Sequence, residues 1–280
     1  MVAWAKEGHE AAFRELIRRY ERPVFALVYR MVRDRALAED LSQETFIKVL
    51  NALASYNPDY KFSSWIFKIA NNAAIDHLRK KDLDTLSLDG APDADTPDAL
   101  KATQLQIGTG GESPLDEVAS RELGGAIERA IAKLRPEYRA CILLRFVEGY
   151  SYEEIADVME IPLGTVKTYI HRARNELREH LADRRPETPP AKGPKEPEMT
   201  DLTTQHLTTE ELELWAQGLL GAARTMHLTE CTLCLAEAEQ ERRLHLALAQ
   251  LPLFAPRAGF ADRVMAQVKV PKTSGGFRVF

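Results

Sequence analysis

The sequence predicts an all-α protein, and three observations support this fold class. Apolar residues recur every three or four positions over several long stretches, which is the spacing that gives a helix one buried face. Ser151 is followed three residues later by Glu154, a capping box of the kind that begins a helix. Pro162 then stands where one helix must end and the next can start. We therefore expect helical bodies joined by linkers.

Composition sets the size and class of the protein. A chain of 280 residues has room for two or three small domains, and 45% hydrophobic with 28% charged residues is typical of soluble globular proteins. The net charge of -5 is unevenly spread, because residues 82–118 carry 1 basic against 9 acidic residues while residues 1–81 carry 14 against 10. Nucleic-acid binding depends on local basic faces, so the total charge does not exclude it.

The sequence gives no sign of export or membrane insertion. The first residues lack a basic patch followed by an apolar core, so we expect no secretory leader. The longest apolar stretch, Leu244–Phe254, is interrupted by polar residues and is too short to span a bilayer. We therefore expect a cytoplasmic protein that does not sense signals directly across a membrane.

Two helical stretches open the chain. The first runs from Glu10 to about Met31, and Pro23 either kinks it or divides it in two. The second, within residues 34–53, turns leucines, valine and phenylalanine inward. Its outward face gathers acidic and amide residues: Glu39, Asp40, Gln43 and Glu44. From spacing alone, this face is simply a solvated one.

The third stretch, residues 60–81, combines aromatic, basic and amide side chains. Unstacked bases of melted DNA need flat surfaces and partners for their edges, and such residues supply both. The simpler alternative is that Trp65 and Phe67 are core residues. The candidate contacts to single-stranded DNA are Lys61, Ser63, Ser64, Trp65, Lys68, Asn71, Asn72, Asp76 and Arg79.

An acidic, glycine- and proline-containing segment, residues 83–118, separates this part from the next. It cannot bury enough apolar surface to order itself, so we expect a flexible linker. Two helices should follow within residues 119–150, with Cys141 on the apolar face as a small buried hydrophobe.

Residues 151–181 read as a helix, a tight turn and a second helix. Val166, Ile170, Ala173 and Leu177 form the buried stripe of the second helix. Such a helix can enter the major groove of DNA, although an ordinary solvated helix pair is the alternative. The opposite face carries the candidate duplex contacts Thr165, Lys167, Thr168, Arg172, Arg174 and Asn175.

These stretches resemble a known family. Three of them, within residues 1–82, are similar to region 2 of extracytoplasmic-function (ECF) sigma factors, the compact bacterial initiation factors: AFRELIRRYERPVFALVYRMV, DRALAEDLSQETFIKV and FSSWIFKIANNAAIDHLRK. Residues 119–184 resemble their region 4, through LRPEYRACILLRFVEGYSYEEIA and the helix pair that follows. Several long motifs in the expected order make chance similarity remote.

The resemblance implies roles for the candidate residues. The acidic helix, with Asp40, Gln43, Glu44 and Phe46, would dock on the RNA polymerase core, which replaces the solvated-face interpretation. Residues 61–79 would melt and read the minus-10 promoter element, and residues 165–175 would read the minus-35 element as duplex. Residues 83–118 would be the acidic linker between the two regions, or alternatively a passive tether.

The chain then continues past the usual end of such factors. After a Pro-rich linker, residues 185–203, comes His227-x-x-x-Cys231-x-x-Cys234, which offers three corners of a tetrahedral zinc site. His206 is the best candidate for the fourth ligand and His245 the second. Without metal, the two cysteines would form a redox pair, and oxidation of a zinc-bound pair could act as a switch.

Residues 204–250 resemble the zinc-binding anti-sigma domain, although the gap from His206 to His227 is short for that family. The resemblance implies one zinc ion, structural or redox-regulatory, and a module that restrains the sigma regions of its own chain. Alternatively, the module adds stability or recruits another partner, and a separate anti-sigma factor provides the restraint. Residues 251–280 are expected to be a tail.

An enzyme is not expected. No set of nucleophile, base and orienting residue appears, and no Gly-rich phosphate loop. The rival interpretation is a helix-turn-helix regulator that is not a sigma subunit. It is disfavoured because no alternating strand and helix pattern of a receiver domain precedes residue 119.

Overall fold

The computed structural model describes residues 1–87, 114–182, 206–249, 251–252 and 254–268. Within these ranges the chain is helical and contains no strand, which confirms the all-α prediction. The predicted Pro-rich linker and most of the predicted acidic linker lie outside the described residues. None of the helices that the structure describes is long and apolar enough to cross a membrane.

The first helices form the N-terminal bundle, residues 2–87. Asp34 begins the third helix by accepting a hydrogen bond from the Leu37 N–H at 2.9 Å, and Arg33 ends the second in the left-handed region with φ 61. Pro23 lies inside one continuous helix. The bundle consists of α1 (Val2–Lys6), α2 (Glu10–Val32), α3 (Arg35–Asn51), the short 3-10 helix η1 (Leu53–Ser55) and α4 (Phe62–Ser87).

Next comes the middle bundle, residues 114–182. The predicted capping box is present, since the Ser151 hydroxyl accepts from the Glu154 N–H and the Glu154 carboxylate accepts from the Ser151 N–H. Glu160, with φ 56, ends that helix before Pro162. The bundle consists of α5 (Pro114–Lys133), α6 (Pro136–Ile142), the π-helical turn η2 (Leu143–Val147), α7 (Tyr152–Met159) and α8 (Leu163–Ala182).

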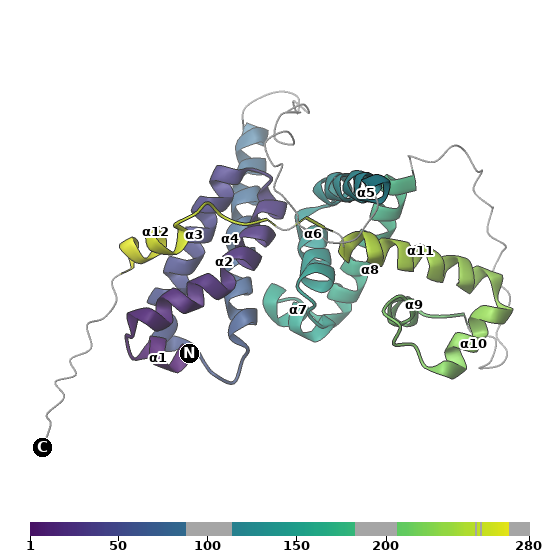
Figure 1. Ribbon diagram of the computed structural model, residues 1–280, viewed down its shortest axis with the longest axis horizontal. Coiled ribbons are helices and arrows are strands. Elements are labelled where there is room, and N and C mark those ends of the chain that lie inside the picture. The colour runs from purple at the N-terminus through teal and green to yellow at the C-terminus, as the bar shows by residue number, and fades with distance from the viewer. Residues whose placement is uncertain (88–113, 183–205, 250, 253, 269–280) are drawn as a thin grey trace, which may run out of the picture.

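The C-terminal extension, residues 206–268, has two parts. The His/Cys module contains α9 (Thr209–Ala216), α10 (Ala222–Glu230) and α11 (Thr232–Ala249). The strap follows from residue 251 and ends in α12 (Phe260–Gln267). In Figure 1 the module lies beside the middle bundle, and the yellow strap crosses the molecule to the N-terminal bundle. The extension therefore contacts both bundles.

The two bundles also pack directly on each other. Helix α4 contacts α6 and α7, α2 contacts α5 and α6, and one hydrophobic core runs through both bundles and into the extension. Arg139 of α6 is buried and donates to the Met31 carbonyl at the end of α2. We call this arrangement, in which the two bundles pack on each other and the extension contacts both, the closed state.

The element boundaries differ from the expected ones in three places. Helix α4 continues to Ser87 and α5 begins at Pro114, so both reach into the range predicted as linker, 83–118. The segment predicted as a tail contains α12, whose Phe260 and Val264 are buried against the N-terminal bundle. Apolar residues at helical spacing, which pack only in the tertiary context, explain this helix.

Candidate functional site

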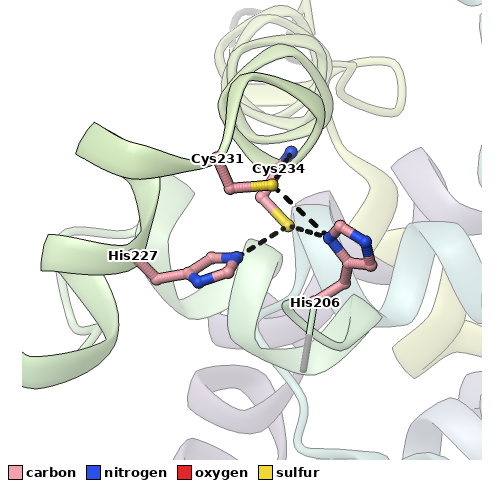
Figure 2. A group of neighbouring side chains, drawn as sticks. All are labelled: His206, His227, Cys231 and Cys234. Carbon is pink, nitrogen blue, oxygen red and sulfur yellow. Dashed lines mark hydrogen bonds between the residues drawn. The ribbon is translucent and has the colours of Figure 1, made fainter. Parts of the chain in front are cut away.

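The four predicted metal ligands lie together at one end of the His/Cys module. One ligand atom from each of His206, His227, Cys231 and Cys234 falls within 4.8 Å of every other. The Cys234 Sγ lies 3.2 Å from the His206 Nδ1 and 3.3 Å from the His227 Nε2, and the Cys231 Sγ lies 3.5 Å from the same His206 Nδ1 (Figure 2). The structure brings His206, which was the least secure ligand, to the other three.

Local structure places each ligand. His227 lies in the last turn of α10, Cys231 caps that helix, and Cys234 lies in the first turn of α11, so one tight connection delivers three ligands. His206 arrives on the segment just before α9. His245, the second candidate, instead packs its ring against Phe146 with the centroids 6.1 Å apart.

These donors fit a tetrahedral metal ion. Bonds of about 2.0–2.3 Å at tetrahedral angles place neighbouring ligand atoms about 3.5 Å apart, close to the 3.2, 3.3 and 3.5 Å separations above, and all four ligand atoms lie within 4.8 Å of one another. The Leu207 N–H donates to the Cys234 Sγ at 3.3 Å, and the Cys234 N–H donates to the Cys231 Sγ at 3.5 Å. Such donors orient thiolate ligands. A bound zinc ion would cross-link the segment before α9 to the connection between α10 and α11.

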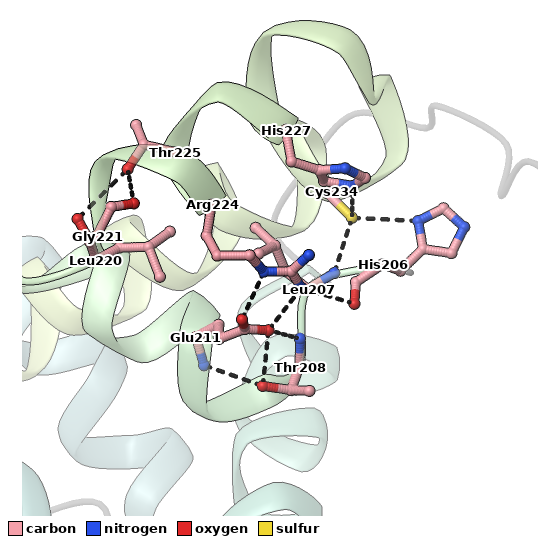
Figure 3. A network of polar contacts seen from close by, with 10 residues as sticks. All are labelled: His206, Leu207, Thr208, Glu211, Leu220, Gly221, Arg224, Thr225, His227 and Cys234. Carbon is pink, nitrogen blue, oxygen red and sulfur yellow. Dashed lines mark hydrogen bonds and ion pairs between the residues drawn. The ribbon is translucent and has the colours of Figure 1, made fainter. Parts of the chain in front are cut away.

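Outer contacts hold the His206 segment in place (Figure 3). Thr208 and Glu211 form a capping box at the start of α9. Arg224 of α10 donates to both Glu211 oxygens at 2.6 and 2.9 Å and to the His206 carbonyl at 3.3 Å. The Arg224 hydrogen bonds lower the pKa of Glu211 to about 2, so this carboxylate is charged at neutral pH. Burial raises the pKa of the Cys234 thiol in the metal-free chain.

The acidic face of α3 is partly covered by the strap. Asp40 and Glu44 are exposed and Gln43 is half-buried. Glu39, predicted to point outward, is buried, because Arg263 and the Arg257 backbone N–H of the strap bind its carboxylate. The sequence could not show this contact, since the strap is more than 200 residues away.

Phe46 and the strap meet on the same face of α3. Phe46 is fully buried, and its ring lies 5.7 Å from that of Phe260, centroid to centroid. Arg14 of α2 pairs with Asp262 of α12 at 2.5 Å. Helix α12 therefore packs against both α2 and α3, and α3 is the helix predicted to dock on polymerase.

The predicted single-strand face of α4 is partly turned toward α7. The Lys61 ammonium lies 2.5 Å from Glu154, and the Lys68 ammonium lies 2.8 Å from Glu160. Asn71, predicted to be on the outer face, is buried with its amide 3.1 Å from the Met159 sulfur. The docking of α7 on α4 is the reason.

The other α4 candidates remain accessible to different degrees. Trp65 is half-buried and packs against Tyr56 and Phe62, with centroids 5.1 and 5.8 Å away. Ser63 and Ser64 are also half-buried, whereas Asn72, Asp76 and Arg79 are exposed. Both readings of Trp65 are compatible with this half-buried position.

The candidate face of α8 divides in two. Lys167, Thr168 and Arg172 are exposed, and Thr165 and Asn175 are half-buried. Arg174 was predicted to be on this outer face, but it is 1% exposed and pairs with Glu241 of α11. The module covers this side of the helix, which sequence spacing within α8 could not reveal.

Comparison with known proteins identifies the family. Residues 16–83 match Sigma-70 region 2, and residues 124–177 match Sigma-70, region 4. The ECF RNA polymerase sigma factor SigW of Bacillus subtilis (strain 168) is 38% identical over 183 residues, which make up 65% of this chain and 95% of SigW. The chain belongs to the ECF sigma factor family.

One further relative and two solved structures are also similar to parts of this ECF sigma factor. The RNA polymerase sigma-H factor of Pseudomonas aeruginosa is 34% identical over 182 residues, covering 63% of this chain and 90% of the relative. Among solved structures, CnrH in complex with the cytosolic domain of CnrY is 22% identical with a TM-score of 0.46 and covers 66% of this chain and 96% of CnrH. The sigma factor RpoE with the anti-sigma factor NepR from Bartonella quintana is 24% identical with a TM-score of 0.47 and covers 62% and 99%.

Membership establishes the general function. ECF sigma factors act in transcription initiation by binding the RNA polymerase core and promoter DNA, and they are not enzymes. The two family matches end at residue 177, so the C-terminal extension lies beyond them. Sequence reasoning located the four cysteine and histidine positions but missed the strap; the helical spacing of Phe260, Val264 and Met265 was the signal that could have revealed α12.

Proposed function

We propose that the C-terminal extension restrains the sigma factor of its own chain. The proposal is supported by the position of α12, which packs against α2 and α3 and contacts Phe46 and Glu39. Polymerase docking by Asp40, Gln43, Glu44 and Phe46 requires access to this face. While α12 lies there, the sigma factor is held in a state that cannot dock fully.

We also propose how the open factor engages promoter DNA. The α4 candidates from Lys61 to Arg79 bind the melted minus-10 element, and Thr165, Lys167, Thr168 and Arg172 of α8 read the minus-35 element as duplex. Lys61 and Lys68 pair with Glu154 and Glu160 at the two ends of α7. These pairs support a restrained state, because they occupy ammonium groups that would otherwise bind the phosphates of single-stranded DNA. The factor would act in the cytoplasm, where RNA polymerase is found.

The metal centre would make the restraint conditional. We infer that His206, His227, Cys231 and Cys234 hold one zinc ion that ties α9, α10 and α11 into one body. The small core of the module, built around Leu207, Leu212, Leu228, Cys234 and Ala238, supports this, because so few buried side chains need a metal cross-link to form a stable unit. Loss of zinc or oxidation of the cysteines would then loosen the module.

Covalent attachment favours restraint within the chain. Attachment within one chain raises the effective concentration of the extension to about the millimolar range, so weak contacts suffice to keep it bound. The module contacts the middle bundle and α12 contacts the N-terminal bundle. Two linked contacts on one chain bind more tightly than either alone, which favours the state in which the extension is docked.

The test compares the full chain with a variant that ends at residue 184. Relatives such as SigW, 95% of which aligns with this chain, are sigma factors of about that length. We expect the truncated protein to bind core polymerase more tightly and to give more run-off transcript, and a chelator to raise the activity of the full chain only. Equal polymerase binding by both proteins would refute the restraint.

A further inference from the structure

Helix α8 carries a basic stripe that faces the His/Cys module. The stripe consists of Lys167, His171, Arg174 and Arg178, at spacings of four, three and four residues, which places them along one side of a helix. From Lys167 to Arg178 it extends about 16 Å, a length over which one strand of a duplex presents several phosphates. The stripe therefore has the charge and length of a surface that binds a polyanion.

Carboxylates of the module lie on this stripe. Glu210 of α9 lies 2.5 Å from the Lys167 ammonium. Glu241 of α11 accepts from the Arg174 Nε at 3.0 Å and from the Arg178 guanidinium at 2.8 Å. Both Arg174 and Glu241 are almost completely buried, at 1% and 0% exposure, so no DNA could reach Arg174 while the module is in place.

A third carboxylate continues the pattern on η2 and α7. Glu213 of α9 is 2% exposed, pairs with Arg145 and accepts a hydrogen bond from the Tyr152 hydroxyl at 2.5 Å. The cleft between α8 and α9 is lined by His171 and Glu210 together with Tyr152 and Lys167. Three separate glutamates of the extension thus meet cationic side chains of the middle bundle.

The physical chemistry explains why charges, and not apolar residues, form this contact. A buried ion pair gives about the same net stability as apolar residues of equal volume, or less. An ion pair at this position is explained if the arginines bind a second, anionic partner after the module detaches. Glu241 also leaves its Oε1 without a hydrogen-bond partner among the described residues, so the contact is not optimised for permanent closure.

We propose that Glu210, Glu213 and Glu241 occupy the positions of DNA phosphates on the middle bundle, so that the module and duplex DNA compete for the α8 stripe. The proposal rests on the proposed function in one respect, the assignment of α8 as the helix that contacts the minus-35 duplex. It adds Arg178 and Arg145 as phosphate contacts that become available on opening, and it assigns the same role to Arg174, which the sequence analysis named as a duplex contact. The alternative is that the stripe binds only the module.

The first experiment uses the full chain and a short fluorescent duplex of mixed sequence, because phosphate contacts do not depend on sequence. Binding is measured by anisotropy at low salt and without polymerase. Glu210→Gln, at an exposed pair, and Glu241→Gln, at the buried one, should each tighten binding, Glu241→Gln by about tenfold. Glu239→Gln, an exposed position on the same helix, is the matched control and should change nothing.

The second experiment separates the proposal from its alternative. In the Glu241→Gln background, Arg178→Gln should reduce the slope of log affinity against log salt by about 0.9, the loss of one phosphate contact. Arg243→Gln, an exposed arginine on α11, should leave the slope unchanged. Tighter binding with no change of slope on Arg178→Gln would overturn the proposal, as would unchanged affinity in both glutamate variants.

Two further measurements distinguish a loss of folding and a failure of the proposed restraint from a change in DNA binding. Zinc content shows that the module of the Glu241→Gln protein is still folded. Core polymerase binding is measured separately, so a failure of the restraint appears there and leaves the duplex result standing.

Discussion

The ring of Phe260 in α12 meets the ring of Phe46 in α3 edge-on, with the centroids 5.7 Å apart and both side chains buried. This contact joins the end of the described chain to the helix that is proposed to dock on RNA polymerase. Aromatic pairs in this geometry contribute about 0.5–1.5 kcal/mol beyond the burial of their area. The contact therefore helps to attach the strap to α3.

Removing this ring should expose the face of α3 that is proposed to bind RNA polymerase. Phe260→Ala deletes a buried aromatic side chain, a change that destabilises its site by about 3–5 kcal/mol. We expect α12 to detach and core polymerase to bind the full chain more tightly, measured by titration with labelled polymerase. Leu246→Ala, at a side chain 50% exposed on α11, is the control and should behave like the parent. Unchanged polymerase affinity in Phe260→Ala would argue against α12 as the restraint.

The metal centre predicts a difference between cysteines. Cys234→Ala should abolish the binding of one zinc ion per chain and lower the thermal stability of the extension, because a ligand is lost from a small module. Cys141→Ala should keep the full zinc content, since Cys141 is buried in the middle bundle, where burial raises its thiol pKa to about 12. Zinc is measured by elemental analysis. Full zinc retention in Cys234→Ala would contradict the assignment.

A buried ion pair joins the two bundles. Arg30 of α2 and Glu128 of α5 are 2% and 5% exposed, with the Nε and Oε1 atoms 2.9 Å apart, and Arg33 binds the other Glu128 oxygen at 2.7 Å. Arg30 also donates to the Pro252 carbonyl at 2.6 Å, so the strap contacts the arginine of this inter-bundle pair. Glu128→Gln leaves this buried arginine without its charge partner.

We expect Glu128→Gln to lower the free energy of unfolding by about 3–5 kcal/mol, measured by urea titration. X-ray scattering should show a larger radius of gyration as the bundles separate. The control is Glu137→Gln, because Glu137 and Arg79 are 34% and 66% exposed and 3.7 Å apart, a pair expected to contribute at most about 1 kcal/mol. Equal effects of the two variants would refute the special role of the buried pair.

Glu148 should make stability depend on pH. Burial raises its pKa from 4.5 to about 7, and Arg30 offsets part of this rise. The folded chain holds this proton more tightly than the unfolded chain, so the contribution is complete below about pH 4.5 and is lost as pH rises through about 7. Glu148→Gln should therefore raise the free energy of unfolding, relative to the parent, more at pH 8 than at pH 5.

Urea unfolding at the two pH values measures this difference. Glu179→Gln, at an exposed position of α8, should show none. A Glu148→Gln protein with the same pH dependence as the parent would show that this carboxyl is ordinary in the folded chain.

Local sequence signals predicted most helices correctly. The capping box at Ser151, the apolar stripe of α8 and the role of Cys141 as a buried small residue all appear in the structure, because they depend on residues within a turn or two of each other. The effect of Pro23 could not be predicted from the sequence, which left open a kink or two helices. The structure shows one helix, α2, with buried residues before and after Pro23. Spacing along the chain predicted His227, Cys231 and Cys234 as one group, with His206 as the best candidate for the fourth member. The structure brings His206 to this group through the packing of α9 on α11.

The sequence by itself determined the helical fold, the sigma family through its motifs, and three of the four residues of the His/Cys cluster, because these features arise from residues close together in the chain. Only the tertiary structure decided which faces are covered. The burial of Glu39 by the strap, of Arg174 by Glu241 and of Asn71 by α7 joins segments far apart in sequence. The periodicity of one helix shows that a face is polar, but the partner that covers it is set by where the rest of the chain packs.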